Sequence, residues 1–82
     1  MKAVLYTRVA VRSLQAHRNR EKQIRKKIDQ YAAHPETLAN NIIQLAGSAA
    51  KRLRVGGFRV LFTENETTIT VLDVGPRGEI YD

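Results

Sequence analysis

The run KRLRVGGFRVLF, residues 51–62, constrains the fold of this chain more than any other segment. Gly56 and Gly57 separate two stretches of strand-forming residues, and a glycine pair between strands predicts a two-residue β-hairpin turn. Such a turn fixes the pairing of the strands and places Arg54 directly opposite Arg59. Like charges in that position repel each other. The sequence therefore predicts a hairpin with an unfavourable cross-strand pair, and that pair needs a physical reason.

Alternation along the two predicted strands sorts their side chains onto two faces. The apolar set, which we expect to form the core, is Leu53, Val55, Phe58, Val60 and Phe62. The opposite set is Arg52, Arg54 and Arg59. Arg77 follows the next predicted strand and is expected near the same face, with Tyr81 four residues later. Lys51 is a further basic candidate if its strand begins one residue later, although alternation otherwise points it toward the core.

A face with four arginines and no acidic residue on the same two strands favours phosphate binding, because guanidinium groups match phosphate oxygens in pairs. A neighbouring aromatic side chain such as Tyr81 can stack on an unpaired RNA base. Two plainer interpretations stay open. The arginines can extend into water while their stems cover the sheet, and Tyr81 can be a half-buried C-terminal anchor.

The rest of the chain predicts an α+β fold, because two helical segments precede a run of strands. We expect a small, twisted antiparallel sheet, made of an N-terminal strand and a three-strand C-terminal meander, with two to three helices on one face. Thr7 is the expected N-cap of the first helix, and His34-Pro35 should end the second. The expected strands are 1–6, 51–55, 58–63 and 68–74, and the expected helices are 8–17, 21–33 and, as a short third helix, part of 35–45.

Charge is the most informative property of the composition. The chain has 82 residues, which suits one domain, with 14 Lys and Arg against 8 Asp and Glu and a formal net charge of +6. A domain this basic usually meets an anionic partner. The chain has no cysteine, which excludes disulfides and cysteine zinc sites, and its two histidines lie far apart, which argues against a metal site. No apolar run is long enough for a signal peptide or a membrane span, so we expect a cytoplasmic protein without a membrane partner.

Two motifs together give the chain a family resemblance. The hairpin KRLRVGGFRVLF and the later stretch TVLDVGPRGEIY resemble the C-terminal half of RelE-type toxins, of the RelE/ParE superfamily of toxin–antitoxin toxins. The N-terminal strand and two helices fit the same layout, so the resemblance spans residues 1–82 as one toxin domain. It implies an mRNA interferase that acts in the ribosomal A site without a metal or other cofactor. The ribose 2′-hydroxyl of the mRNA attacks the adjacent phosphate in such toxins.

The resemblance also implies roles for individual residues. Arg59 matches the hairpin arginine that stabilises the phosphorane charge, and Arg77 matches the arginine that protonates or stabilises the leaving group. Tyr81 matches the terminal tyrosine that stacks on or orients the substrate. Arg52 stands where relatives often carry an active-site lysine, and Arg54 matches another basic position on that strand.

The chain departs from the family pattern where a second lysine is expected, because Ala50 stands there and Lys51 is next to it. Arginine stays protonated and is a poor general base. His17 and His34 are expected at helix ends, and Glu79 is a weak candidate for a base. The chemistry would therefore depend on positioning and charge stabilisation.

The same resemblance leaves other functions open. The ParE branch inhibits DNA gyrase and lacks this combination of arginines and tyrosine. A catalytically weak toxin could act mainly as a co-repressor that reaches operator DNA only through its antitoxin. Every version implies a cognate antitoxin, often acidic, that covers the helices, the arginines or both, and a net charge of +6 would favour that encounter.

Overall fold

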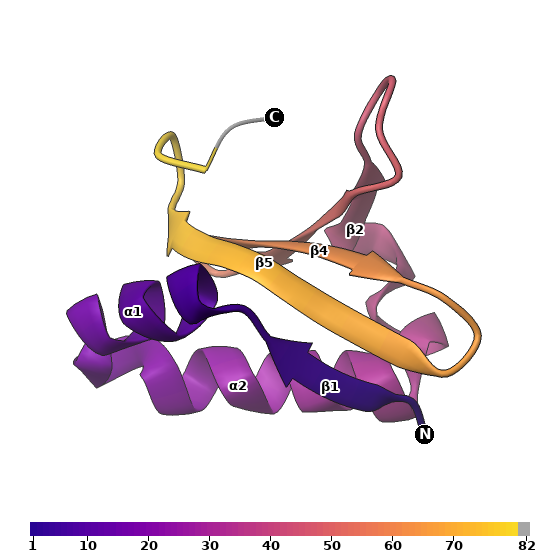
Figure 1. Ribbon diagram of the computed structural model, residues 1–82, viewed down its shortest axis with the longest axis horizontal. Coiled ribbons are helices and arrows are strands. Elements are labelled where there is room, and N and C mark those ends of the chain that lie inside the picture. The colour runs from indigo at the N-terminus through magenta and orange to yellow at the C-terminus, as the bar shows by residue number, and fades with distance from the viewer. Residues whose placement is uncertain (81–82) are drawn as a thin grey trace.

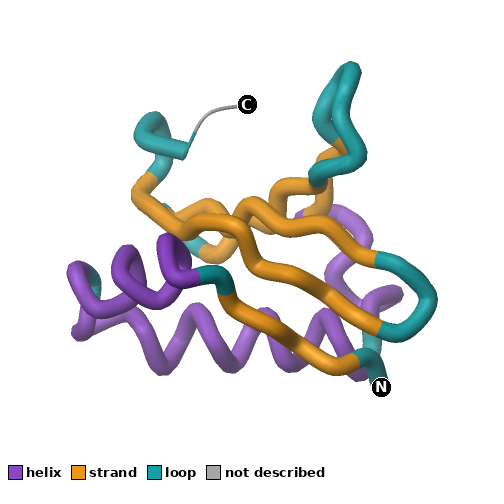
Figure 2. Tube along the Cα trace, viewed as in Figure 1, coloured by secondary structure: helices purple, strands orange, loops and turns teal. Residues whose placement is uncertain are grey.

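The computed structural model describes residues 1–80 as a five-stranded sheet covered on one face by helices (Figures 1 and 2). The strand order is β1-β5-β4-β3-β2. The predicted α+β class is therefore confirmed. The elements are β1 (Ala3–Tyr6), α1 (Arg8–Ala16), α2 (Arg18–Ala33), the 3-10 helix η1 (Pro35–Asn41), β2 (Ile42–Gln44), β3 (Lys51–Val55), β4 (Phe58–Glu64) and β5 (Thr68–Pro76).

The two α-helices begin and end largely where local sequence signals place them. Thr7 caps α1, since its hydroxyl oxygen accepts a 3.0 Å hydrogen bond from the Ala10 amide. The predicted link at residues 18–20 is wrong, because α2 already begins at Arg18 and only His17 separates the helices. α2 ends before Pro35, as predicted. Within residues 1–80, neither helix is long and apolar enough to cross a membrane.

The segment after α2 differs from the expected short helix. A 3-10 helix covers Pro35–Asn41 and buries Leu38, and the chain then extends into β2. β2 pairs antiparallel with β3, with Ile42 opposite Leu53 and Ile43 opposite Arg52. The backbone groups at the outer edge of β3 thereby gain partners. β-branched Ile42 and Ile43 suit this strand better than a helix.

The sheet is mixed, whereas the sequence predicted an antiparallel one. β1 lies parallel to β5, with Val4 opposite Ile69. The remaining pairs, β5 with β4, β4 with β3 and β3 with β2, are antiparallel. No turn joins β1 to β5, since three helices and three strands lie between them in the chain, so the sequence carries no local signal for their relative direction.

The β3–β4 hairpin has the predicted register and the predicted division into two faces. Val55 lies opposite Phe58 and Arg54 opposite Arg59. Gly56 has a φ of 57°, which is the left-handed conformation that the first position of a type II′ turn requires. The predicted apolar set faces the helices, with Phe58 at its border. The fully buried large side chains of the core are Phe62, Leu14, Ile24, Ile28, Leu53, Ile69, Val60 and Val71.

A charged cluster ties four elements together at the end of β4 away from the hairpin turn. Both carboxylate oxygens of Glu64 are used: Lys2 donates to one at 2.7 Å, and Lys51 donates to the other at 2.7 Å. The hydroxyl of Tyr31 also donates to Glu64. Burial alone would raise the pKa of Glu64, but these hydrogen bonds outweigh it and lower the pKa to about 2. The cluster joins the start of the chain, α2, β3 and β4.

We expect Glu64→Gln to lower the free energy of unfolding by about 1–3 kcal/mol at neutral pH, because two ammonium groups lose their carboxylate partner. The folded-state pKa of Glu64 lies below its unfolded value, so its stabilisation is present above the unfolded value and is lost as pH falls toward about 2. Urea unfolding at neutral pH and at pH 3 should therefore show that the free energy of unfolding falls less on acidification in the variant than in wild type. An equal fall in both proteins would contradict this role of Glu64.

Candidate nucleic-acid interface

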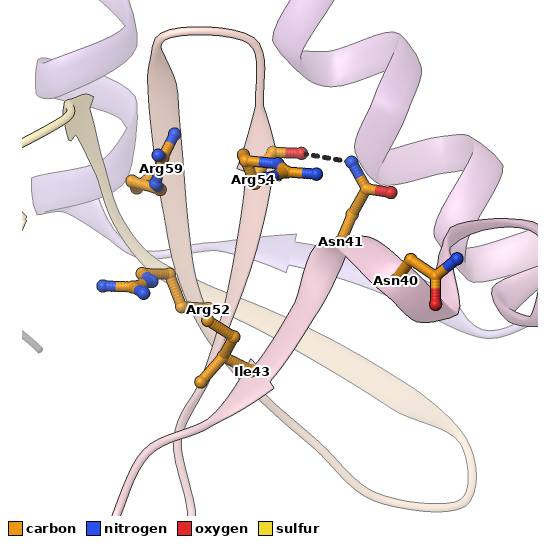
Figure 3. Close-up of a pocket in the computed structure, with 6 residues that line it drawn as sticks. All are labelled: Asn40, Asn41, Ile43, Arg52, Arg54 and Arg59. Atoms are coloured by element: carbon orange, nitrogen blue, oxygen red, sulfur yellow. Dashed lines mark hydrogen bonds between the residues drawn. The ribbon is translucent and has the colours of Figure 1, made fainter.

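Three arginines from the hairpin line one shallow pocket on the face of the sheet that the helices leave uncovered (Figure 3). Arg52 and Arg54 come from β3, and Arg59 comes from β4. The pocket has a volume of about 130 Å³. Its other lining residues are Asn40, Asn41 and Ile43. The structure thus brings together the three hairpin arginines that strand alternation predicted on one face. We call these three residues and Arg77 the arginine face.

Arg59 is held in place by the turn that precedes its strand. One terminal nitrogen of its guanidinium donates to the carbonyl oxygens of Gly56 at 3.0 Å and Phe58 at 2.9 Å. Burial lowers the pKa of Arg59 from its ordinary value, and three neighbouring positive charges lower it further. Those charges belong to Arg52, Arg77 and Arg54. The arginine face therefore concentrates positive charge in a fixed place, which is the condition for binding an anion.

Arg77 belongs to this group through the backbone as well as through its charge. Its amide donates a 2.7 Å hydrogen bond to the carbonyl oxygen of Gly57, which ties the end of β5 to the hairpin turn. The chain then turns at Gly78, whose φ is 91°, and returns so that Ile80 packs directly over Gly75. The turn after β5 and the loop between β2 and β3 both project on the side away from the helices (Figure 1).

Two predicted site residues are not part of the arginine face as described. Lys51 points to the helix side of the sheet and binds Glu64, as strict alternation requires. Tyr81 lies outside the described residues 1–80. Ala50, where the resemblance led us to expect a lysine, is buried just before β3.

Asp73, His17 and His34 contact other side chains, and Glu79, the candidate base, is exposed. Asp73 accepts a 2.7 Å hydrogen bond from the Ser13 hydroxyl, which links β5 to α1. His17 packs its ring edge against Phe58, with 5.0 Å between ring centroids. His34 lies near the Glu36 carboxylate on the surface, and Glu79 is exposed in the last turn. In residues 1–80 no group of three histidine or acidic side chains could hold a metal ion. The arginine face can bind and stabilise negative charge.

The structure adds three residues to the site that sequence reasoning missed. Asn40, Asn41 and Ile43 border the pocket beside the arginines, and the Asn41 side-chain amide donates a 3.3 Å hydrogen bond to the Arg54 carbonyl (Figure 3). The segment was expected to be helical, so neither asparagine was placed beside β3. The signal that could have located them is the β-branched pair Ile42-Ile43, which marks a strand.

Comparison with known proteins identifies a family and several structures of the same fold. The model of the family described as "ParE toxin of type II toxin-antitoxin system, parDE" matches residues 3–81. None of the curated proteins matches the chain. The RelE of the archaeal RelE–RelB complex from Pyrococcus horikoshii OT3 is similar in structure, with a TM-score of 0.76 and 23% identity over 96% of this chain and 98% of that one.

Two further solved structures have the same fold at lower identity. YafQ from Escherichia coli strain BL21(DE3) has a TM-score of 0.76 and 7% identity, and the match covers 100% of both chains. The toxin–antitoxin complex RelBE2 from Mycobacterium tuberculosis has a TM-score of 0.61 and 20% identity, covering 93% of this chain and 98% of that one. At these identities the likeness establishes the fold, and it extends over nearly the whole chain.

We expect Arg54→Ala to leave the free energy of unfolding unchanged or to raise it by up to about 1 kcal/mol, because it removes a like-charge cross-strand pair. Sulfate should raise the melting temperature of wild type more than that of Arg54→Ala or Arg59→Ala, because the anion binds the folded arginine face. Thermal unfolding with and without sulfate measures both effects. Lys26→Ala, which removes one charge from the exposed side of α2, is the control and should keep the full sulfate effect.

We expect Gly75→Ala to destabilise the protein by about 1 kcal/mol, because the new methyl group would stand 3.1 Å from Cδ1 of Ile80 and 3.2 Å from its Cγ1. Urea unfolding measures this loss. Gly57→Ala is a matched control, since a methyl group there has no atom within 4 Å and the residue does not require a positive φ. A Gly75→Ala protein as stable as Gly57→Ala would show that the last turn does not pack on β5 in solution.

Proposed function

The chain belongs to the family of ParE toxins of type II toxin–antitoxin systems, and we propose, from the chemistry of its arginine face, that this face binds mRNA and promotes cleavage of the RNA backbone. The observation that supports this most directly is the convergence of Arg52, Arg54 and Arg59 on one pocket, with the charge of Arg77 close enough to lower the pKa of Arg59. Three guanidinium groups lining one pocket, with the charge of a fourth arginine nearby, suit a phosphodiester, whose oxygens accept paired hydrogen bonds.

The proposed reaction is attack of a ribose 2′-hydroxyl on the adjacent phosphorus. The new bond from the 2′-oxygen to phosphorus forms as the bond to the 5′-oxygen breaks. The 2′-hydroxyl gives up one proton to solvent and the departing 5′-oxygen takes up one, which leaves a cyclic phosphate and a free 5′-hydroxyl with no net change in protons. Charge builds on the phosphate oxygens in the transition state, and in this proposal Arg59 stabilises it; the contacts of its guanidinium to two carbonyl oxygens support the role by restricting its position. Arg77 serves the leaving oxygen and Tyr81 orients the neighbouring base. Arg52 and Arg54 hold the backbone.

Arginine supplies charge and does not accept protons at neutral pH. The rate would therefore come mainly from holding the reacting atoms in line and from stabilising negative charge. This requirement suits a substrate that the ribosome already holds in one conformation. We accordingly assign the toxin to translating ribosomes in the cytoplasm.

A cognate antitoxin is the expected protein partner. Two of the similar structures, RelE–RelB and RelBE2, are complexes of a toxin with its antitoxin. An acidic antitoxin would be attracted by the net charge of +6 and could neutralise the arginine face. Contact with operator DNA would come through that complex.

Primer extension on a reporter mRNA in a cell-free translation system tests the proposal. Wild type should produce breaks within codons only while ribosomes translate. Arg77→Ala and Tyr81→Ala should each reduce them by about a hundredfold or more, because the first removes charge stabilisation of the transition state and the second removes positioning of the substrate. Lys26→Ala is the charge-matched control and should cut like wild type. Intact mRNA with wild type would refute the nuclease.

DNA gyrase is the alternative target, because the family model that matches the chain is that of the ParE toxins. A DNA supercoiling assay with purified gyrase distinguishes the two. Inhibition of gyrase by wild type, together with intact mRNA, would assign the chain to the gyrase inhibitors. Absence of both activities, with tight binding of an antitoxin, would instead support a weak toxin that works as a co-repressor.

A further inference from the structure

The pocket on the arginine face has two chemically different sides. Arg52, Arg54 and Arg59 form a charged side, which suits a phosphate. Asn40, Asn41 and Ile43 form the other side, which combines side-chain amides with an apolar surface. An aliphatic surface offers a phosphate neither a hydrogen bond nor a positive charge. A nucleotide has both an anionic group and a flat, mostly apolar base with hydrogen-bonding edges, so the two sides together match a whole nucleotide.

Asn41 is fixed in position by the backbone of β3. Its side-chain amide donates to the Arg54 carbonyl at 3.3 Å, so the asparagine and the arginine are held together at one place on the sheet (Figure 3). Asn40 precedes it at the end of η1 and is exposed. An asparagine amide presents one acceptor and two donors, a pattern that matches the N6 and N7 atoms of adenine.

Ile43 provides the apolar contact. It lies directly opposite Arg52 in the β2–β3 pair, and 51% of its surface is exposed although it is a large aliphatic residue. Its neighbour Ile42 faces the other way and packs against the core. An exposed isoleucine in the same pocket as three arginines offers an apolar surface against which a base can pack.

We propose that Asn40, Asn41 and Ile43 form a base-recognition subsite, which holds the nucleotide whose phosphate is bound by the hairpin arginines and which favours adenine. This inference rests on the proposed function, since it assigns a base preference to the same RNA-binding face. Arg52, Arg54 and Arg59 then bind RNA of any sequence, whereas the β2 edge discriminates between bases.

Binding of short single-stranded RNAs tests the subsite without requiring cleavage. The probes are fluorescein-labelled oligoadenylate and oligouridylate with methylated 2′-hydroxyl groups, measured by anisotropy at low ionic strength. Wild type should bind oligoadenylate about tenfold more tightly than oligouridylate, the lower part of the range for one amide–adenine contact. Asn40→Ala and Asn41→Ala should reduce that preference to about twofold or less, and Ile43→Ala should weaken oligoadenylate more than oligouridylate.

Two controls separate recognition from general affinity. Asn19→Ala removes an exposed asparagine from α2 and should keep the full preference. Arg54→Ala should weaken both RNAs by a similar factor and leave their ratio unchanged. An Asn40→Ala protein with the wild-type preference, or a wild-type protein that binds both RNAs equally, would overturn the subsite.

The two experiments distinguish failure of the base-recognition subsite from failure of the proposed cleavage activity. If the translation assay shows breaks and their base composition is the same in Asn40→Ala and wild type, the subsite is wrong and the nuclease stands. If the assay shows intact mRNA while Asn40→Ala loses the binding preference, the subsite stands and the cleavage is wrong.

Discussion

The pairing register of β3 with β4 is the constraint on which the rest of the molecule depends. A slip of one residue would move every side chain of the strand that slips to the opposite face, and would bring either Arg52 and Arg54 or Arg59 against the helices. The turn at Gly56 excludes that slip, because a glycine in the left-handed conformation allows a two-residue connection. One tight turn therefore sets both the composition of the core and the chemistry of the arginine face.

The stabilising and destabilising charges of β4 lie at its opposite ends. Near the turn, Arg59 faces Arg54 across the strands and lies within reach of two more arginines. At the other end, Glu64 binds two lysines and a tyrosine in a half-buried setting. The apolar residues between them face the helices. Repulsion at one end can persist because the core and the Glu64 cluster hold the strand in place.

Sequence reasoning succeeded where the information is local. A two-residue turn determines its own register, so the opposition of Arg54 and Arg59 and the inward direction of Lys51 could both be predicted. It failed where the partner is distant in sequence. The strand Ile42–Gln44 covers the edge of β3, and β1 pairs parallel with β5 although three helices and three strands separate them along the chain. The asparagines of the pocket depend on β2, so they could not be placed either.

Only one face of the sheet is covered by helices. Substitutions at inward-facing positions therefore change the core, whereas substitutions at outward-facing positions change the exposed surface. Along β3 and β4, the side chains alternate between the helix-covered face, which carries the core, and the uncovered face, which carries the arginines. Lys51 and Arg52 are adjacent in sequence, yet one stabilises the fold through Glu64 and the other lines the pocket. Substitutions at the outward positions can redirect binding toward a different anionic or protein target without repacking the interior. A family built on this sheet can thus acquire new targets while its fold remains the same.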